Sequence, residues 1–572
     1  MTDKAPPALL LGPMLRHVDT TTATVWVETT HNATVQVRSH GRSASSRTFT
    51  VEGHHYALVL LDGMEPATEG TYDVAIDGEP VWPGPDDPRP KPIIRTLPDH
   101  AQTPTHDLDI VFGSCRVDRP HESPWNLPPE EHPDGVGVDA LSALADDCQA
   151  RRRRLPDLLL MLGDQVYADE GLSPRVRERQ IQRRGADSEP TAEVLDFEEY
   201  TWLYRDSWSD PDVRWLLSTV ATAMIFDDHD VRDDWNTSEA WREEVRKLAW
   251  WRERVVGAYM SYWVYQHLGN LSPDVLAHDA LLQKVMDADE GGQALRAFAE
   301  RAADDVDDQH ESLWSYVRDL GRARLVVIDT RSGRILHDGQ RSMLGEDEWR
   351  VVEQWLRGDV EHLIVASSLP LIIDHLLHDV EQWDEALAGG TWGAPGIWLG
   401  EKLRQAADLE HWAAFPESFA RLVTRLGEVA AGQHGSAPST VLILSEDVHH
   451  SYLAPVLYPD ADGSSSPVVQ VTSSPMRNAF PRSVQRAFRM AHTGPARRFG
   501  ALLRRSVRLP PPPVDWRLTT GPLYGNGVGS LRISGDTVVV RLERAELDGE
   551  KGTLRVRHEE QICRFPGIGG TD

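Results

Sequence analysis

Polar side chains stand directly after the buried β-strands that this sequence predicts, and this recurring strand ending limits the fold more than any other feature. The run LLLML, residues 158–162, is short and wholly apolar, which is typical of a strand covered on both faces in an α/β fold. It stops at Gly163, and Asp164 and Tyr167 follow at once. Because α/β folds bind ligands at the carboxyl ends of parallel strands, these side chains are candidate site residues.

Five of the predicted strands end in this way, and their repetition carries more weight than any single ending. An Asp after a strand is often a helix N-cap, and a lone Cys or His is usually part of a core. Several carboxylates at one sheet edge, however, raise one another's pKa unless a cation neutralises them, so the pattern predicts one metal centre. The candidates are Cys115 in FGSC, Asp164 and Tyr167 in GDQVY, Asp227, Asp228, His229 and Asp230 in DDHD, Asp329 in VVIDT, and Asp447, His449 and His450 in DVHH.

The strand pattern changes along the chain and predicts three parts. Near the N-terminus, TATVWVET (residues 22–29) alternates apolar and polar side chains, which predicts a β-sandwich strand, and a proline-rich linker follows at 83–92. From residue 107, short buried strands alternate with helical patterns, which indicates an α/β domain. The expected parts are an N-terminal β-sandwich (1–100), an α/β domain (101–480) with a helical insertion at about 173–320, and a basic arm with C-terminal strands that complete the α/β domain (481–572).

Composition argues against several classes of partner. With 59 Lys and Arg against 89 Asp and Glu, the net charge is −30, and such a surface repels nucleic-acid phosphates and anionic lipid. No apolar stretch reaches the roughly 18 residues that a membrane helix needs. The three Cys form no disulfide framework and the first residues lack a signal-peptide core, so we expect a cytoplasmic protein, or an exported one if a leader was removed.

One segment departs from this acidic balance. Residues 480–513 carry arginines at 482, 486, 489, 497, 498, 504, 505 and 508, followed by four prolines. This segment would attract an anionic substrate, but charge runs alone are weak evidence. We therefore interpret it as an exposed connecting arm.

The order GDQVY, DDHD, DVH resembles the calcineurin-like metallophosphoesterases and, within them, the alkaline phosphatase D (PhoD-like) family. The superfamily pattern is D-x-H, GD-x-x, GNH-[DE], a later His and GH-x-H. Here Cys115 stands at the first motif, and GDQVY matches the GD-x-x-Y form that purple acid phosphatases also use. The resemblance covers about residues 107–480. It implies a four-layer α-β-β-α sandwich, here with an N-terminal all-β sandwich domain and a helical insertion.

The resemblance also implies two metal ions that share one carboxylate. A thiolate, a phenolate and an imidazole hold the first ion, and phenolate favours Fe³⁺. The second site has oxygen ligands only, which suit Ca²⁺, with Mg²⁺ or Mn²⁺ as rivals; the family implies iron with calcium. In this sequence the shared carboxylate is Asp164, the first ion takes Cys115, Tyr167 and His449, and the second takes Asp228 and Asp447.

Further positions carry implied catalytic roles. His229 stands at the superfamily's catalytic His, where it would contact the phosphate and protonate the leaving group, with Asp230 as its orienting partner; a purely supporting role for His229 is equally open. Among the arginines after strand ends, Arg116 ranks before Arg331 and Arg334 as a grip on phosphate oxygens. Asp227, Asp233, Asp234 and Asn236 are expected to support the second site.

Two departures from the family pattern stand out. Ser367 and Ser368 follow the strand at 362–368 where the superfamily has a His, which removes a nitrogen ligand and disfavours zinc. In addition, SED precedes the last motif where GD is usual.

We therefore expect a hydrolase that acts on small-molecule phosphate esters, as a phosphomonoesterase, a phosphodiesterase or both, through water activated by two metals. One alternative is a phospholipase-D-like enzyme or another metallohydrolase that uses the same site. The other is a non-catalytic binding protein with a structural metal, whose coordination sphere would be closed to water.

Overall fold

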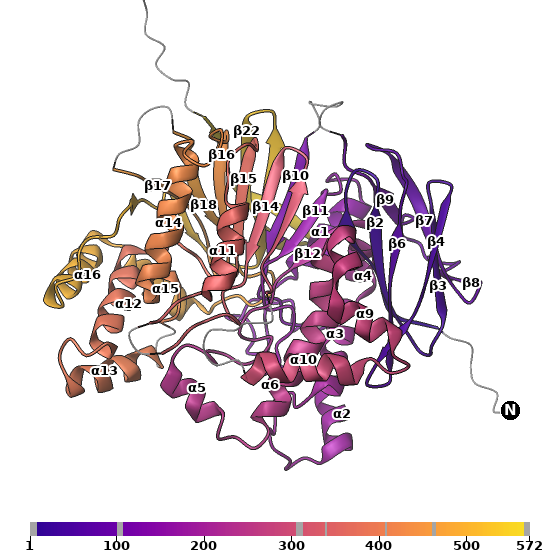
Figure 1. The fold of residues 1–572 in the computed structure, drawn as a ribbon, viewed down its shortest axis with the longest axis horizontal. Helices are drawn as coiled ribbons and strands as arrows, with labels where there is room; N and C mark the ends of the chain where they lie inside the picture. Colours follow the sequence, from indigo (N-terminus) through magenta and orange to yellow (C-terminus); the bar gives the residue numbers. More distant parts are fainter. Residues whose placement is uncertain are drawn as a thin grey trace, which may run out of the picture.

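The computed structural model describes residues 8–99, 107–304, 313–337, 340–405, 409–459 and 465–564. Two large β-sheets lie face to face between layers of helices, and a pair of smaller sheets lies at one end of the molecule (Figure 1). The protein is thus a four-layer α-β-β-α sandwich with an N-terminal β-sandwich and added helices.

The N-terminal sandwich packs tightly on the α/β domain. β2 was expected to bury one face only, but all seven of its residues are buried, because its sheet is also covered by elements of the domain. Trp26, for example, lies against Tyr265, with ring centroids 5.3 Å apart. One sheet contains β1 (Leu9–Val18), β2 (Ala23–Thr29), β6 (His54–Leu61) and β5 (Phe49–Val51); the other contains β4 (Arg42–Arg47), β3 (Thr34–Ser39), β7 (Glu69–Ile76), β8 (Glu79–Trp82) and β9 (Ile93–Arg95).

The two large sheets contain the six buried strands expected from the sequence, with further strands at their edges. The parallel strands β10, β11 and β12 form half of the six-stranded sheet, and β14, β15, β16 and β18 are parallel in the other. In order, the sheets are β12 (Thr222–Met224), β11 (Leu158–Met161), β10 (Leu108–Gly113), β21 (Gly527–Ser534), β22 (Thr537–Asp548), β23 (Lys551–Cys563); and β13 (Tyr316–Leu320), β14 (Ala323–Ile328), β15 (His362–Ser367), β16 (Thr440–Ser445), β18 (Val468–Thr472), β17 (Ser451–Leu457), β19 (Asp515–Trp516), with β20 (Thr520–Leu523) paired to β17.

The continuous apolar runs follow from burial on both faces. In β14, Leu325 and Val327 point into the core between the sheets, whereas Val326 and Ile328 pack into a second core. Helices α11 (Glu346–Trp355) and α14 (Pro416–Ala430) cover this second core. Since successive side chains of a strand point to opposite faces, both sets must be apolar.

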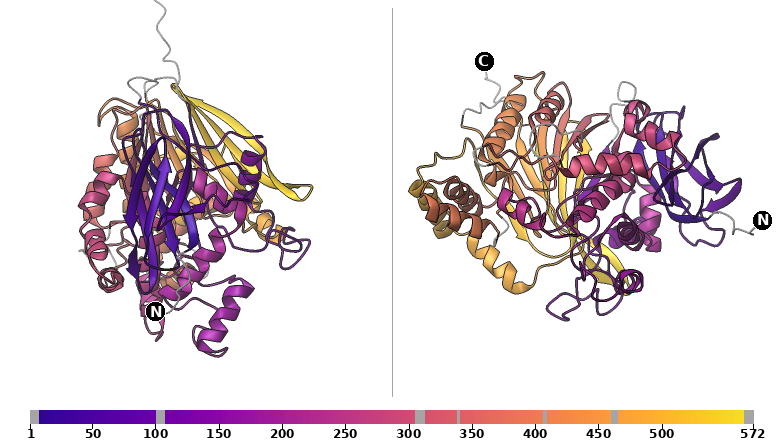
Figure 2. Two further views of the ribbon diagram at one scale, coloured as in Figure 1. Left: turned by 90° about the vertical axis from the view of Figure 1, so that its right-hand side faces the viewer. Right: turned by 60° about the horizontal axis from the view of Figure 1, so that its bottom comes forward.

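Helices occupy most of the segment expected as an insertion, but β12 lies inside it and belongs to the six-stranded sheet. The basic segment forms two helices, α15 and α16, and α16 packs on α12. The sandwich and α16 lie at opposite ends of the molecule (Figures 1 and 2). The remaining helices are α1 (Ala140–Gln149), α2 (Pro174–Arg184), α3 (Phe197–Trp208), α4 (Pro211–Thr219), α5 (Glu239–Val245), α6 (Trp251–Ser261), continued by a π-helical turn (Tyr262–His267) into α7 (Leu268–Asn270), α8 (Pro273–His278), α9 (Ala280–Asp287), α10 (Gly292–Asp304), α12 (His375–Ala388), α13 (Ala394–Arg404), a 3₁₀ turn (Trp412–Ala414), α15 (Arg482–Ala491) and α16 (Gly494–Ser506).

A partly buried ionic group joins the sandwich to α3. His54 Nδ1 on β6 lies 3.3 Å from Glu28 Oε1, and its Nε2 lies 2.6 Å from Glu198 Oε2 of α3. Burial lowers the pKa of His54, but the hydrogen bonds to Glu198 and Glu28 outweigh this effect and raise the pKa to about 9. The ring is therefore charged at neutral pH.

Because its pKa is higher in the folded chain, charged His54 stabilises the fold fully below pH 6.5, and this contribution is lost as the pH rises through about 9. We expect His54→Gln to lower the urea midpoint of unfolding strongly below pH 6.5 and much less above pH 9. The half-exposed His31→Gln in the turn after β2 serves as the control. An equal loss for His54→Gln at both pH values would contradict this role.

Candidate metal centre

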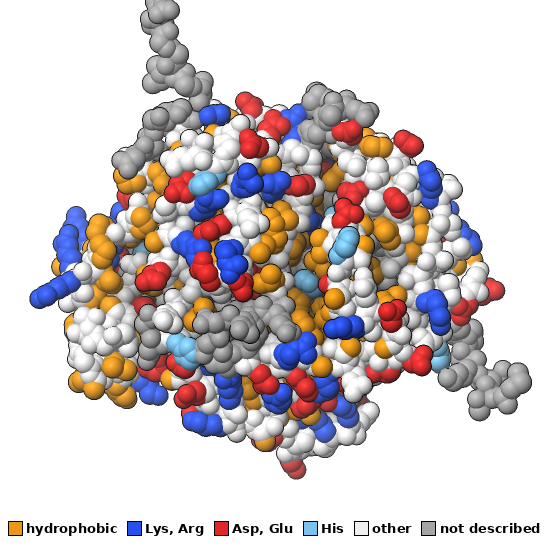
Figure 3. All heavy atoms as spheres, in the orientation of Figure 1, with side chains coloured by type: hydrophobic (Ala, Val, Ile, Leu, Met, Phe, Trp, Pro, Cys, Tyr) orange, Lys and Arg blue, Asp and Glu red, His pale blue; other side chains and the backbone are white. Residues whose placement is uncertain are grey.

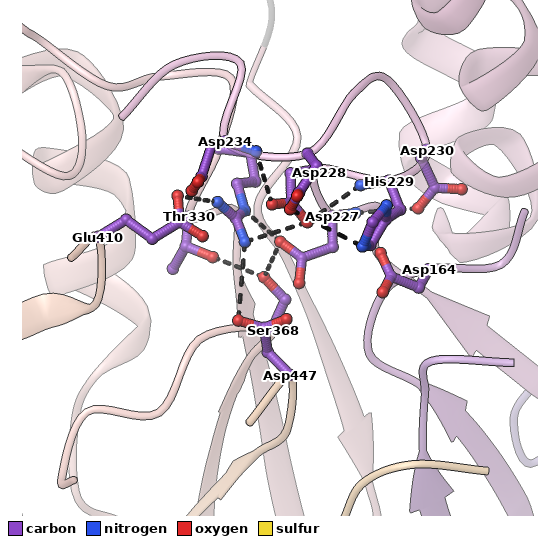
Figure 4. Close-up of polar contacts among 12 residues, drawn as sticks. Asp164, Asp227, Asp228, His229, Asp230, Asp234, Thr330, Ser368, Glu410 and Asp447 are labelled. Atoms are coloured by element: carbon purple, nitrogen blue, oxygen red, sulfur yellow. Dashed lines mark hydrogen bonds and ion pairs between the residues drawn. The ribbon is translucent and has the colours of Figure 1, made fainter. Parts of the chain in front are cut away.

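Loops from three parallel strand ends bring acidic side chains and a thiol together. Ligand atoms of Cys115, Asp164 and Asp447, which follow β10, β11 and β16, all lie within 4.8 Å of one another. The same limit holds for the group Asp164, Asp228 and His229, and for Asp227, Asp228 and Asp447. Figure 4 shows these carboxylates pointing toward a common centre. Residues more than three hundred positions apart in the sequence thus share one small cluster.

Tyr167 reaches the same cluster, and His449 follows Asp447 by two residues in the loop after β16. The Tyr167 hydroxyl donates to Asp164 Oδ2 at 3.1 Å, and its ring lies 4.5 Å from that of His229 between centroids. His449 is not part of the groups within 4.8 Å, and its ring stacks on Phe480 with centroids 4.5 Å apart. Its buried Nδ1 has no hydrogen-bond partner in the part of the chain that the structure describes.

The backbone at these positions is strained. Cys115, Asp164, Asp447 and His449 have φ angles of 49°, 46°, 67° and 51°, in the left-handed region that non-glycine residues avoid. Such residues cost roughly 1–3 kcal/mol each and gather at functional sites. Gly163 has a φ of 136°, and a Cβ there would lie 2.7 Å from the Asp227 Cβ, so the close approach of the two loops requires glycine.

The cluster holds more negative charge than its own cations balance. Burial first, and the neighbouring carboxylates second, raise the pKa of Asp447 well above its usual range. Burial and the neighbouring carboxylates also raise the pKa of Glu446 well above its usual range. At Asp228, burial raises the pKa to about 8 even though Arg331 opposes the shift. Three buried carboxylate oxygens, on Asp164, Asp227 and Glu446, have no hydrogen-bond partner among the described residues. A bound cation would satisfy both the charge and these oxygens.

Arg331 supplies the positive charge that is built into the cluster. Its side chain is fully buried and pairs with Asp227 and with Glu410. Its Nη2 lies 3.3 Å from Asp228 Oδ1 and 3.8 Å from Asp447 Oδ2, and forms no hydrogen bond within the described chain. Burial would raise the pKa of Glu410, but Arg331 and Arg334 hold it well below its usual range.

Arg116, which the sequence analysis ranked first among the arginines, lies elsewhere. Its Nη2 is 2.7 Å from Asp139 Oδ2, and its Nη1 donates to the Ser207 carbonyl at 2.8 Å. Asp139 is the N-cap of α1, so this pair anchors a helix. Arg116 forms a β-bridge with Arg477, and Asp139 and Ser207 hold its guanidinium away from the cluster that Cys115 faces.

Asp169 orients His229. The sequence had predicted Asp230 for this role. His229 Nδ1 lies 2.9 Å from Asp169 Oδ1. Asp230 instead accepts from the backbone N–H groups of Asp227 and Val166, at 2.9 and 3.3 Å, because its side chain closes the turn after β12. Burial alone would lower the pKa of His229, but Asp169 and Asp164 raise it well above its usual range.

Some residues of the cluster had weak or absent signals in the sequence. Glu446 precedes Asp447 in SEDVHH, and a second acid after a strand was a usable signal. Glu410 lies in a loop before the 3₁₀ turn and has no local pattern that points to Arg331. Asp329 accepts from Arg331 N at 2.8 Å and Ser332 N at 3.1 Å, so it closes a turn, as a single Asp after a strand often does.

The fold is similar to that of a solved structure. A solved structure of PhoD matches with a TM-score of 0.59 at 13% identity, covering 99% of this chain and 92% of that chain, which bears on the fold alone. Purple acid phosphatase PPD1 from yellow lupin (Lupinus luteus) seeds matches with a TM-score of 0.49 at 11% identity, covering 98% and 74%. A comparison with curated proteins finds no match.

Two family models match the chain. The model of a domain of unknown function (DUF7800) matches residues 6–94, the N-terminal sandwich. The model described as PhoD-like phosphatase matches residues 147–498, which include Asp164, His229 and Asp447. Since this second match spans more than half of the sequence, the chain belongs to the PhoD-like phosphatase family.

Proposed function

We propose that the chain hydrolyses small-molecule phosphate esters, monoesters or diesters, at the cluster around Asp164. Membership of the phosphatase family supports hydrolysis of phosphate esters in general. The observation that carries the proposal is the meeting of Cys115, Asp164 and Asp447 within 4.8 Å from three separate strand ends. Buried acids without enough partners are costly unless they hold a cation, so a purely structural origin of this meeting is unfavourable.

The donor atoms fit two unlike cations. Cys115, Asp164, Tyr167 and His449 would hold Fe³⁺, since thiolate and phenolate suit that ion. Asp228 and Asp447, with Asp164 shared, would hold Ca²⁺, with Mg²⁺ or Mn²⁺ as rivals. Among the described residues, Asp164 Oδ1 and His449 Nδ1 have no hydrogen-bond partner, which supports this assignment. When bound, such a pair supplies positive charge that stabilises phosphoryl oxygens and lowers the pKa of water.

The protein's own groups would complete the chemistry. His229, held by Asp169 through Nδ1, would present a proton from Nε2 to the leaving oxygen of the ester. Arg331 pairs with Asp227 and Glu410 and lies 3.3 Å from Asp228 Oδ1, so we assign it to positioning ligands and not to gripping substrate. The His229 side chain keeps 14% of its surface exposed, which supports a role in contact with substrate.

Replacing Cys115 by Ser should remove the thiolate ligand and with it the iron. We expect iron per chain, measured by elemental analysis, to fall at least about tenfold, and kcat/KM for p-nitrophenyl phosphate and bis-p-nitrophenyl phosphate to fall by about a hundredfold or more. Cys148→Ser, at another buried cysteine in α1, is the matched control and should keep metal and activity. Full activity in metal-free Cys115→Ser protein would refute the proposal.

Replacing Arg331 by Met should leave Asp227 buried without its ion-pair partner and leave Glu410 paired with Arg334 alone. We expect the free energy of unfolding, measured in urea, to fall by about 3–5 kcal/mol. Arg324→Met, which removes a partly exposed arginine of the same strand region, should cost at most about 1 kcal/mol. Equal costs for the two substitutions would show that Arg331 does not balance the cluster.

A further inference from the structure

The arginine-rich segment is a local reversal of charge in an acidic protein. Residues 480–513 contain eight arginines and no Asp or Glu, whereas the whole chain carries −30. In α15, Arg482, Arg486 and Arg489 recur at three- and four-residue steps and are exposed, so they share one face of the helix. Met490 stands beside them with 71% of its surface exposed.

Large apolar side chains are exposed next to these arginines. In α16, Phe499 and Leu502 are 55% and 59% exposed, and the exposed Arg498 and Arg505 lie on the same face. In α13, Trp398 is 66% exposed. Such a gathering of exposed apolar groups marks an interaction surface in most proteins.

The helices that carry these residues are neighbours. α12 packs against both α13 and α16, and α15 packs against α16. Trp392, just before α13, lies 5.8 Å from Trp383 of α12 between ring centroids, and Trp383 Nε1 donates to Ser506 Oγ at the end of α16 at 3.1 Å. In Figure 3, arginine side chains project at the left edge and hydrophobic side chains gather below them. The basic–apolar surface consists of Trp392, Ile397, Trp398, Met490, Phe499 and Leu502 with Arg486, Arg489, Arg498 and Arg505.

Most of the cations of this surface are not used inside the fold. Arg497 pairs with Asp515 at 3.1 Å and Arg504 pairs with Asp379 at 2.6 Å, so these two hold α16 in place. Arg486, Arg498 and Arg505 have no ion-pair partner in the described part of the chain. Their charge is available to an anionic partner.

We propose that the basic–apolar surface docks on an anionic phospholipid surface. Helix faces that expose Trp, Phe and Leu beside Arg favour the boundary between lipid headgroups and acyl chains. The net charge of the chain does not prevent this, because salt screens charges beyond about 8 Å and the local arginines dominate at contact. A symmetric contact with a second copy is disfavoured, since it would place arginines against arginines.

Docking of the basic–apolar surface on lipid does not depend on the proposed hydrolysis of phosphate esters. The full chain should co-sediment with vesicles of equal parts phosphatidylcholine and phosphatidylserine, should not co-sediment with phosphatidylcholine alone, and should be released by salt. Arg498→Gln/Arg505→Gln should weaken partition about tenfold or more. Trp398→Ala/Phe499→Ala should also weaken it, including at the lowest salt concentration.

Arg42→Gln/Arg47→Gln is the matched control. It removes the same charge from exposed positions of β4, in the sandwich at the opposite end of the molecule, and should leave partition unchanged. All substituted side chains are exposed, and an unchanged melting temperature verifies the fold of each variant. Absence of binding to phosphatidylserine vesicles, or an equal loss in the control, overturns the proposal. So does a dimer, seen by light scattering without vesicle binding, that Trp398→Ala/Phe499→Ala dissociates.

Discussion

The balance of charge around Arg331 is the constraint on which the site depends. One buried guanidinium contacts Asp227, Asp228 and Glu410 and approaches Asp447, while further carboxylates lie within the same small volume. Arg331 does not offset this number of buried carboxylates, and burial together with the neighbouring acids raises the pKa of Asp228 and of Asp447. The site thus contains more carboxylates than the protein's own cations neutralise, and bound metal ions would neutralise the rest.

The double layer of sheets makes this arrangement possible. Strands buried on both faces are fixed in register by apolar contacts, so their carboxyl ends meet without support from the polar residues themselves. The strain at Cys115, Asp164, Asp447 and His449 can persist because the rigid strands beneath each loop determine where it begins. The apolar contacts that stabilise the fold are concentrated in the sheets, and the candidate site residues lie in the loops that follow the strands.

The sequence predicted those features that depend on local pattern. The apolar runs identified the buried strands, and the motifs that follow them identified Cys115, Asp164 and Asp447 as neighbours. Features that depend on the direction of a side chain were not predictable in this way: Asp230 is adjacent to His229 in sequence, yet Asp169, sixty residues earlier, holds its ring. Glu410 could not be found because its partner is chosen only by tertiary packing. Net charge was similarly uninformative about α15 and α16, because an average over the chain conceals a local reversal of sign.

The position of β21 has a consequence for biosynthesis. β10, whose end carries Cys115, lies between β11 and β21, and β21 begins only at residue 527. One edge of β10 therefore stays without its hydrogen-bonded neighbour until most of the polypeptide has left the ribosome. During synthesis this unpaired edge is therefore open to pairing with other chains for longer than any edge that a neighbouring segment covers at once.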